Sequence, residues 1–323
     1  MSIGPMSELA ADRFALHHAD LATGVRLSYL REGAGGHPLV LVHGYPETKR
    51  IWWRNVAPLA AAGFEVIVPD LRGFGDSGLA DDGFYDTAAF SVDVHALVHD
   101  VLGHEACVVV GGDAGMAVVI DLGLRFPGFV ERQVVFNGPV PVLREAYAAA
   151  GIPRDPDRHH RPQADYFLRQ GTDPAGLAAE LDTPERRRAY VADFYGHRLW
   201  GAPGAFSPEA VDFMTEPFGD AAKLRAAWGM YEVACGTRPP LAAPRLFEPS
   251  AVPTLVLHGP EDHVVPPSFP DRCTVAFPEA VGPFVVPGAG HFLQWERAEL
   301  LNRTLTWFLG DLRRASAGQA GAR

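Results

Sequence analysis

A Gly-Gly-Asp-Ala-Gly turn at residues 111–115 places the carboxylate of Asp113 where it could act as a nucleophile. An apolar run at residues 106–110 precedes the turn, and a helical pattern follows it. A sharp strand-to-helix turn requires such small residues because its backbones pass closely, and the amides at the helix start stabilise an anion. A carboxylate attacking an acyl carbon gives an anhydride, whereas attack on an alkyl carbon gives an ester that water can cleave. Asp113 therefore predicts covalent catalysis at a saturated carbon.

Two further residues follow Asp113 in the chain, first an acid and then a base, and each comes after a strand pattern. Asp262 follows the apolar run at residues 254–258, and His291 lies in a Gly-Ala-Gly-His-Phe segment after the last such run. Asp262 would accept the imidazole N–H and leave the other ring nitrogen free. His291 would then deprotonate the water that cleaves the Asp113 ester. Glu261 is the alternative partner for His291.

An oxyanion site is expected at residues 43–47, His-Gly-Tyr-Pro-Glu, which also follow an apolar run. The backbone N–H groups of Tyr45 and Ala114 would hold the Asp113 oxygen when its ester becomes tetrahedral. Three side chains are expected to bind the substrate, namely those of His43, Pro46 and Trp228.

The elements that must position these residues alternate between strand and helix. Eight runs have the length and composition of strands, at residues 14–21, 25–30, 38–42, 64–68, 106–110, 132–136, 254–258 and 283–286. From residue 39 onward the apolar runs do not alternate with polar residues, which is typical of parallel strands buried on both faces. Helical patterns occur at residues 87–102, 114–126 and 296–312. The chain is predicted to form an α/β fold with a doubly wound, mostly parallel sheet of eight strands.

A long segment at residues 140–247 interrupts this alternation. It is rich in Ala, Arg, Pro and aromatic residues and indicates several helices joined by Pro/Gly loops. Ligands of open α/β sheets bind beyond the carboxyl ends of the strands, where such an insertion would stand. We therefore expect a core domain at residues 1–139 and 248–323, and a helical cap domain at residues 140–247 inserted after the sixth strand.

Together these motifs resemble the epoxide hydrolases of the α/β-hydrolase fold, the branch with an aspartate nucleophile that lies near the haloalkane dehalogenases. The likeness covers nearly the whole chain. It includes residues 43–47, Pro-Asp-Leu-Arg-Gly-Phe-Gly-Asp-Ser at 69–77, the aspartate turn, and Gly-His-Phe-Leu-Gln-Trp-Glu at 290–296. The resemblance implies the α/β-hydrolase fold with a helical cap, and an enzyme without a cofactor. It also implies the reaction, in which an epoxide and water give a vicinal diol through an ester on Asp113.

In that family, two cap tyrosines polarise the epoxide oxygen and protonate the leaving alkoxide. Asp-Tyr-Phe at residues 165–167 and Trp-Gly-Met-Tyr at residues 228–231 match their motifs, so the resemblance assigns these roles to Tyr166 and Tyr231. A phenol with a pKa near 10 is a suitable acid for a strongly basic alkoxide. Tyr190 and Tyr195 are the alternatives for these roles. The cap carries one further tyrosine, Tyr147.

The chain departs from the family pattern near the turn and in the cap. The family usually has His at the position of Gly112, often an aromatic residue at Ala114 and often Arg at Glu232. The small Ala114 should leave extra room beside Asp113 and admit a bulkier substrate.

Two other functions stay open. A haloalkane or haloacid dehalogenase would use the same triad of Asp113, His291 and Asp262. The haloalkane enzymes supply halide donors from a Trp after the nucleophile and often an Asn in the oxyanion loop, where this chain has Ala114 and Tyr45. That difference favours epoxide opening. A non-catalytic ligand-binding protein on the same fold is the second alternative.

The composition bounds the partners and the location. The 323 residues carry a net charge of −11 with no run of Lys or Arg, which indicates neither a nucleic-acid nor a membrane-surface partner. No apolar stretch is long enough to cross a bilayer, and the first residues lack the pattern of a signal peptide. We expect a cytoplasmic enzyme that acts on a small-molecule epoxide, with a homodimer as a possible assembly.

No metal site is expected. His95 and His99 lie four residues apart on a predicted helix, but Ala96 stands where a zinc protease motif has Glu. The three cysteines form no CxxC pair. A packed or solvated helix face explains these histidines.

Overall fold

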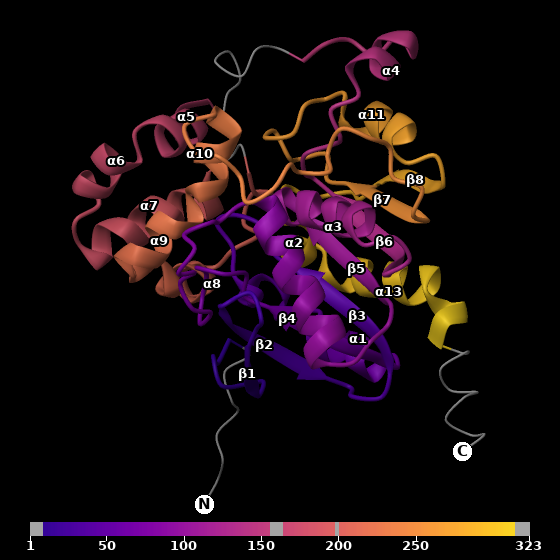
Figure 1. Cartoon of the computed structure of the whole chain (residues 1–323), viewed down its shortest axis with the longest axis horizontal. Helices are drawn as coiled ribbons and strands as arrows, with labels where there is room; N and C mark the ends of the chain where they lie inside the picture. Colours follow the sequence, from indigo (N-terminus) through magenta and orange to yellow (C-terminus); the bar gives the residue numbers. More distant parts are fainter. Residues whose placement is uncertain (1–8, 156–163, 198–199, 314–323) are drawn as a thin grey trace, which may run out of the picture.

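The computed structural model describes residues 9–155, 164–197 and 200–313 and contains an eight-stranded sheet. The strand order is β1-β2-β4-β3-β5-β6-β7-β8 (Figure 1). β1 pairs with β2 and β2 with β4 in antiparallel fashion, and the other pairs are parallel, so the predicted sheet is confirmed. The strands are β1 (Leu16–Asp20), β2 (Arg26–Glu32), β3 (His37–Val42), β4 (Phe64–Pro69), β5 (Cys107–Gly112), β6 (Val130–Phe136), β7 (Thr254–His258) and β8 (Ala280–Val285).

The core helices pack on this sheet in pairs. α2 (Thr87–His95) lies beside α3 (Asp113–Arg125), and α1 (Val56–Ala61) lies beside α13 (Ala298–Phe308). Every residue of β4 and β5 is buried, which explains why these strands are apolar except for Glu65. The helix predicted at residues 87–102 is α2 followed by a π-helical turn. The one predicted at residues 296–312 divides into α12 (Leu293–Glu296) and α13.

The segment between β6 and β7 is helical, as predicted. A group of its helices gathers on one side of the sheet (Figure 1), namely α5 (Ala164–Thr172), α6 (Pro174–Glu180), α7 (Pro184–Gly196), α8 (Pro208–Thr215), α9 (Ala221–Ala227) and α10 (Gly229–Cys235). Three of these helices begin with the same signal, a capping side-chain oxygen followed by proline at the first helical position. The capping residues are Asp173, Thr183 and Ser207. Local sequence therefore fixes where these helices start.

The two ends of this segment pack on the core instead. α4 (Arg144–Ala149) stands apart from the group and contacts α11 (Phe269–Ala276), a core helix (Figure 1). On the return path, the amide of Arg245 donates to Asp121 of α3 at 2.7 Å. Both ends of the segment thus contact core helices.

The loop at residues 69–77 links core and cap. Asp70 accepts a hydrogen bond from the Lys49 amide at 2.8 Å and pairs with the Lys49 ammonium at 2.5 Å, in the protein interior. The ammonium of Lys223 in α9 donates to the Gly75 carbonyl of this loop at 2.6 Å. The motif therefore contributes to the placement of the cap.

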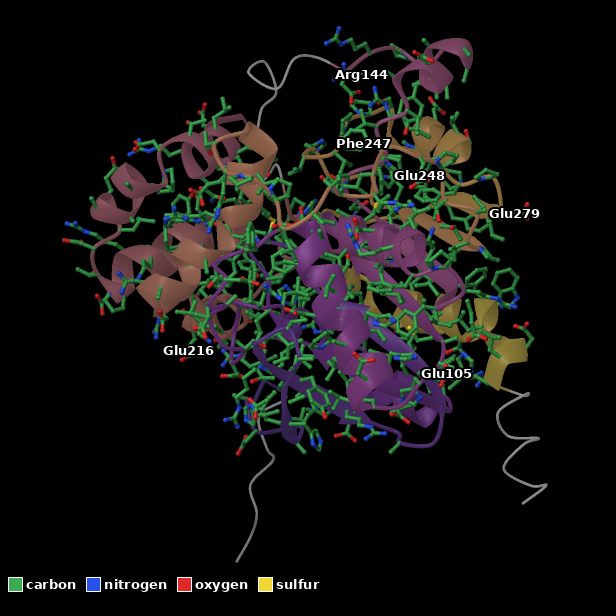
Figure 2. All side chains as sticks on the ribbon, in the orientation of Figure 1. Glu105, Arg144, Glu216, Phe247, Glu248 and Glu279 are labelled. Carbon is green, nitrogen blue, oxygen red and sulfur yellow. The ribbon has the colours of Figure 1, made fainter. Side chains whose placement is uncertain are left out.

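Charged side chains are prominent at the periphery, where Figure 2 shows Glu105, Glu216 and Glu279. Within the described ranges, no helix combines the length and apolar character that a membrane crossing requires.

Candidate active site

The turn that carries Asp113 has the predicted strand–turn–helix structure. β5 ends at Gly112, and α3 begins with Asp113, whose φ of 46° lies in the left-handed region that residues other than glycine rarely adopt. Close contacts explain the glycines. A Cβ at Gly111 would lie 2.7 Å from the Gly115 backbone, and one at Gly115 would lie 2.6 Å from the Val42 carbonyl oxygen. The turn brings the carboxylate to the carboxyl end of β5.

The structure brings the predicted nucleophile, base and acid together. Nε2 of His291 lies 3.1 Å from Asp113 Oδ2, and its Nδ1 lies 2.7 Å from Asp262 Oδ2. The other oxygen of Asp262 accepts hydrogen bonds from the amides of Val264 and Val265, at 2.7 and 3.2 Å, which fix the carboxylate. Nδ1 can therefore donate to Asp262 while Nε2 faces Asp113, the geometry of a catalytic triad.

The two carboxylates set the charge of His291. Burial alone would lower the pKa of His291, but Asp262 and Asp113 outweigh burial and hold that pKa well above its ordinary value of 6.5. The two carboxylates thus favour the protonated form of His291. Neutralising either carboxylate would lower its pKa and favour the imidazole base.

The predicted oxyanion donors lie beside the Asp113 carboxylate. The Tyr45 amide donates to Asp113 Oδ1 at 2.7 Å. Ala114 is the second residue of α3, and amides in the first turn of a helix have no partner within the helix. A Cβ at Gly44 would lie 2.5 Å from Asp113 Oδ1 and 3.0 Å from the Ala114 nitrogen, so a glycine is required to leave this space open.

Glu47, for which the sequence predicted no role, supports the oxyanion loop from inside the protein. Its carboxylate accepts hydrogen bonds from the Gly44 amide at 2.6 Å and from the Gln294 side chain at 2.8 Å. Burial, and then the negative charge of Asp113, raise the pKa of Glu47 to about 7. The sequence shows this Glu next to the turn, but its partner Gln294 lies 247 residues further along the chain.

A cavity of about 300 Å³ opens above the nucleophile, between the sheet and the cap. Asp113 and His291 line it from the core, and Tyr166 and Tyr231 line it from α5 and α10. The other walls are mostly apolar, and are made by Thr87, Ala114, Ala117, Asn137, Gly138, Pro139, Phe167, Met230, Ala234, Val264, Val265 and Pro266. Such a lining suits a small apolar molecule held by a few polar groups.

The cap tyrosines differ in what their hydroxyl groups contact. Tyr166 and Tyr231 have ring centroids 5.8 Å apart. Burial raises the pKa of both well above 10, and the negative Asp113 adds to the rise, so both are proton donors. The other three hydroxyls bond elsewhere and do not line the cavity: Tyr190 with Gln170, Tyr195 with the Pro46 carbonyl and Tyr147 with the Pro141 carbonyl.

The three side chains expected to bind substrate do not line the described cavity wall. The buried ring of His43 lies 2.9 Å from the Gly44 carbonyl and accepts from the Leu71 amide at 3.0 Å, which ties two loops together. The indole of Trp228 donates to the Tyr45 hydroxyl at 3.2 Å. Their contacts are those of residues that support the site, and Pro46 contributes its carbonyl to Tyr195.

Asn137 was missed by sequence reasoning, although it joins three parts of the site. Its amide group donates to the Gly290 carbonyl at 2.8 Å and accepts from the Gly259 amide at 3.0 Å. Its own carbonyl accepts from the Asp113 amide at 3.2 Å. The Asn-Gly pair after β6 signalled only a turn, and its φ of 45° agrees with that signal.

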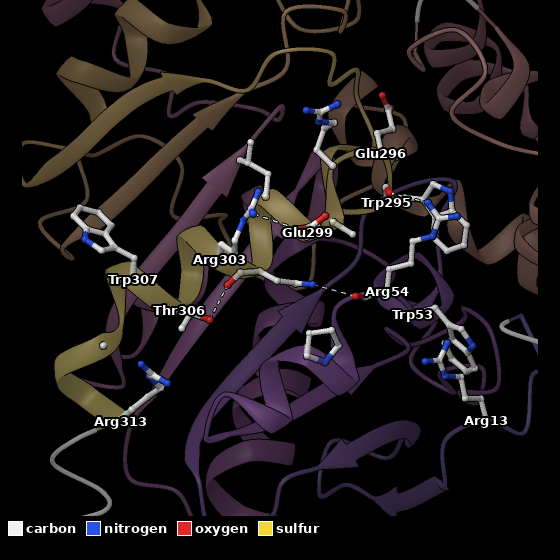
Figure 3. Close-up of a pocket in the computed structure, with 16 residues that line it drawn as sticks. Arg13, Trp53, Arg54, Trp295, Glu296, Glu299, Arg303, Thr306, Trp307 and Arg313 are labelled. Carbon is white, nitrogen blue, oxygen red and sulfur yellow. Dashed lines mark hydrogen bonds and ion pairs between the residues drawn. The ribbon is translucent and has the colours of Figure 1, made fainter.

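A larger hollow of about 1200 Å³ lies against α13, away from these residues (Figure 3). Its wall includes Arg13, Arg54, Trp295, Arg303 and Trp307, and it shares no residue with the catalytic cavity. Its described wall contains the carboxylates of Glu296 and Glu299 but no His, so it lacks the imidazole base that the triad has. The smaller cavity is therefore the candidate active site.

The helix that carries His95 and His99 also carries a possible third metal ligand. The π-helical turn, Ala96–Val101, brings donor atoms of His95, His99 and Asp100 within 4.8 Å of one another. His99 Nδ1 bonds to Asp100 at 2.7 Å, and these residues do not line the catalytic cavity. The mechanism predicted from the sequence uses no metal ion, so it requires none at His95, His99 and Asp100.

The fold and the site define a hydrolase of the α/β class. The chain belongs to the alpha/beta hydrolase fold family, which it matches over residues 37–298. It is 39% identical to a soluble epoxide hydrolase of Corynebacterium sp. (strain C12) over 139 residues, covering 42% of this chain and 46% of that enzyme. It is 28% identical to epoxide hydrolase A of Mycobacterium tuberculosis, covering 90% of this chain and 95% of that enzyme. A haloalkane dehalogenase of Mycobacterium marinum is 29% identical over 91% of this chain and 94% of its own length. The solved structure of the epoxide hydrolase CorEH is similar with a TM-score of 0.78 and 23% identity, covering 93% of this chain and 100% of that one.

Proposed function

We propose that the protein is an epoxide hydrolase in which Asp113 attacks one carbon of the epoxide ring. One observation carries this proposal, namely that the carboxylate and two cap tyrosines, Tyr166 and Tyr231, line the same cavity. Epoxide opening needs both, because the carboxylate forms the new bond while a phenol stabilises and protonates the leaving oxygen. The relatives that are named epoxide hydrolases support the same function.

In the first half-reaction, the Oδ2 atom of Asp113 forms a bond to an epoxide carbon. The ring C–O bond breaks, its electron pair goes to the oxygen, and the Tyr166 or Tyr231 hydroxyl supplies the proton. The Oδ1 atom stays with the Tyr45 amide and becomes the carbonyl oxygen of the ester. The result is a hydroxyalkyl ester of Asp113.

In the second half-reaction, water attacks the Asp113 carbonyl carbon. Esterification has removed one of the two negative charges that raise the pKa of His291, so His291 gives up its proton, which restores the phenolate left by the first step. The resulting imidazole then takes a proton from the attacking water while Asp262 holds the ring in place. The Tyr45 and Ala114 amides would stabilise the charge on Oδ1 in the tetrahedral intermediate. Its collapse breaks the bond to Oδ2 and releases the diol.

The cavity wall distinguishes this reaction from dehalogenation. Halide binding needs N–H donors beside the nucleophile, and the described cavity wall contains no Trp, Lys or Arg side chain. The indole of Trp228 is bonded to Tyr45, and the amide of Asn137 is bonded to the Gly290 carbonyl. The hydroxyls of Tyr166 and Tyr231 suit an epoxide oxygen better than a halide.

A single turnover in heavy-oxygen water, with apolar epoxides as substrates, tests the proposal. The covalent route places the label in the Asp113 carboxylate, while the diol formed in that first turnover keeps an unlabelled oxygen from Asp113. Label that enters the diol directly would contradict the route. Halide release measured with haloalkanes in parallel distinguishes the dehalogenase, and a wild-type protein as inactive as Asp113→Asn would indicate a ligand-binding protein.

The division into a core at residues 1–139 and 248–323 and a cap at residues 140–247 is part of this proposal. The residues of α5 and α10 that line the cavity support it. The small-molecule substrate follows from the function, whereas the homodimer and the cytoplasmic location stay predictions.

A further inference from the structure

We propose that the side-chain hydroxyl of Tyr45 is an anchor that sets both cap tyrosines, Tyr166 and Tyr231, relative to Asp113. The inference rests on the proposed function and adds a positioning residue to it. Tyr45 is fully buried, and its two polar ends serve different parts of the site. Its backbone amide donates to Asp113, whereas its hydroxyl bonds to two residues of the cap.

The Tyr45 hydroxyl accepts one hydrogen bond from each helix that carries a cavity tyrosine. Nε2 of Gln170 in α5 donates at 2.7 Å, and Nε1 of Trp228, the residue before α10, donates at 3.2 Å. Gln170 lies one helical turn after Tyr166. Trp228 lies one turn before Tyr231, and its carbonyl accepts the Tyr231 amide at 2.9 Å. Each tyrosine is thus tied through one helical turn to the same oxygen atom.

Ring packing reinforces this connection. The Tyr45 ring meets the Tyr231 ring edge-on, with centroids 5.2 Å apart and planes at 79°. It also meets Phe194 of α7 edge-on at 5.8 Å. A displacement of the Tyr45 side chain would therefore act on Tyr231 directly, as well as through Trp228.

The side-chain amide of Gln170 forms hydrogen bonds through its NH₂ group but not through its oxygen. Gln170 donates to the Tyr190 hydroxyl at 2.8 Å as well as to Tyr45, and its own Oε1 is buried without a hydrogen-bond partner. A buried amide that leaves one acceptor unpaired is costly. The NH₂ group of Gln170 donates to two phenolic oxygens, those of Tyr45 and Tyr190, and these bonds hold α5 in position.

The substitution Tyr45→Phe removes this one oxygen and keeps the ring and the backbone amide. We expect ester formation to slow by about 10- to 100-fold, because a small displacement of the tyrosines misaligns the proton donors. Ester hydrolysis depends on His291, Asp262 and backbone amides, so its rate should stay within about threefold of the wild type. A role limited to stability would lower both rates by the same factor.

Rapid acid quench of a single turnover, with the ester on Asp113 measured by mass spectrometry, separates the two rates. Tyr147→Phe is the matched control, because it also removes one buried tyrosine hydroxyl, which bonds to the Pro141 carbonyl outside the site. If Tyr45 acts through Tyr231, the rate losses of Tyr45→Phe and Tyr231→Phe should not multiply in the double variant. Equal losses in both half-reactions, or a full multiplication, would overturn the inference.

Amide hydrogen exchange tests the same anchor without a substrate. Tyr45→Phe should speed exchange in α5 and α10 together, while Tyr147→Phe should leave both helices at the wild-type rate. Unchanged exchange in both helices of Tyr45→Phe would overturn the anchor. If the wild-type protein opened no epoxide, the proposed function would fail, and the exchange result would still decide whether Tyr45 fixes the helices.

Discussion

The substitution Glu47→Gln should change how the stability of the protein depends on pH. Glu47 is buried beneath the oxyanion loop, and burial together with Asp113 raises its pKa from 4.5 to about 7. A carboxyl group with a raised pKa in the folded state contributes stability below its unfolded pKa of 4.5. That contribution is lost as the pH rises through the folded value of about 7. The wild type should therefore lose stability from this group between pH 4.5 and 8.

The rise from 4.5 to about 7 corresponds to about 3 kcal/mol, since each pH unit is worth about 1.4 kcal/mol at 25 °C. Glutamine does not titrate and can still accept the hydrogen bond from the Gly44 amide. Its new NH₂ group takes the place of the oxygen that accepts from Gln294 Nε2, so the Gln294 amide must turn over to present its buried, unpartnered Oε1 atom as the acceptor. The free energy of unfolding of Glu47→Gln, minus that of the wild type, should thus grow by about 3 kcal/mol from pH 4.5 to 8.

Urea unfolding of both proteins at several pH values measures this difference. Glu65→Gln is the control of opposite sign. Burial alone would raise the pKa of Glu65, but hydrogen bonds from the Gly35 amide and from His104 lower it. Its stabilisation is present above its unfolded pKa and is lost as the pH falls. A Glu47→Gln difference that stays constant with pH, or that follows the direction of Glu65→Gln, would refute the reasoning.

Three further predictions concern the reaction. His291→Gln should still form the Asp113 ester but fail to cleave it, so the intact mass should increase by one substrate molecule; an unmodified protein would contradict this. Gly44→Ala should lower kcat by about 100-fold or more, because its Cβ would lie 2.5 Å from Asp113 Oδ1, whereas Gly196→Ala meets no atom within 4 Å and should be active. Ala114→Trp should fill the cavity beside the nucleophile, so turnover of bulky epoxides should fall more than that of small ones; equal rates for bulky epoxides before and after the change would show that Ala114 does not set the size limit.

The sequence by itself determined the features whose requirements are local. The nucleophile turn needs small residues between a strand and a helix, and these are five consecutive residues at 111–115. The central strands, β3 to β7, could be predicted because burial on both faces demands mostly apolar runs, which are visible without any knowledge of the neighbouring strands. Chain order then indicated Asp262 and His291. In the structure His291 forms one hydrogen bond with Asp113 and another with Asp262.

The tertiary structure decided which side chains face the cavity and which support it. The family motifs favoured Tyr166 and Tyr231 over Tyr190 and Tyr195, and the packing of α5 and α10 places the first two in the cavity wall. Trp228, expected in the wall, bonds instead to Tyr45, 183 residues earlier in the chain. Such partners are brought together by long-range packing, and no spacing along the chain encodes that distance. The roles of Glu47 and the Tyr45 hydroxyl could therefore be inferred only from the folded protein.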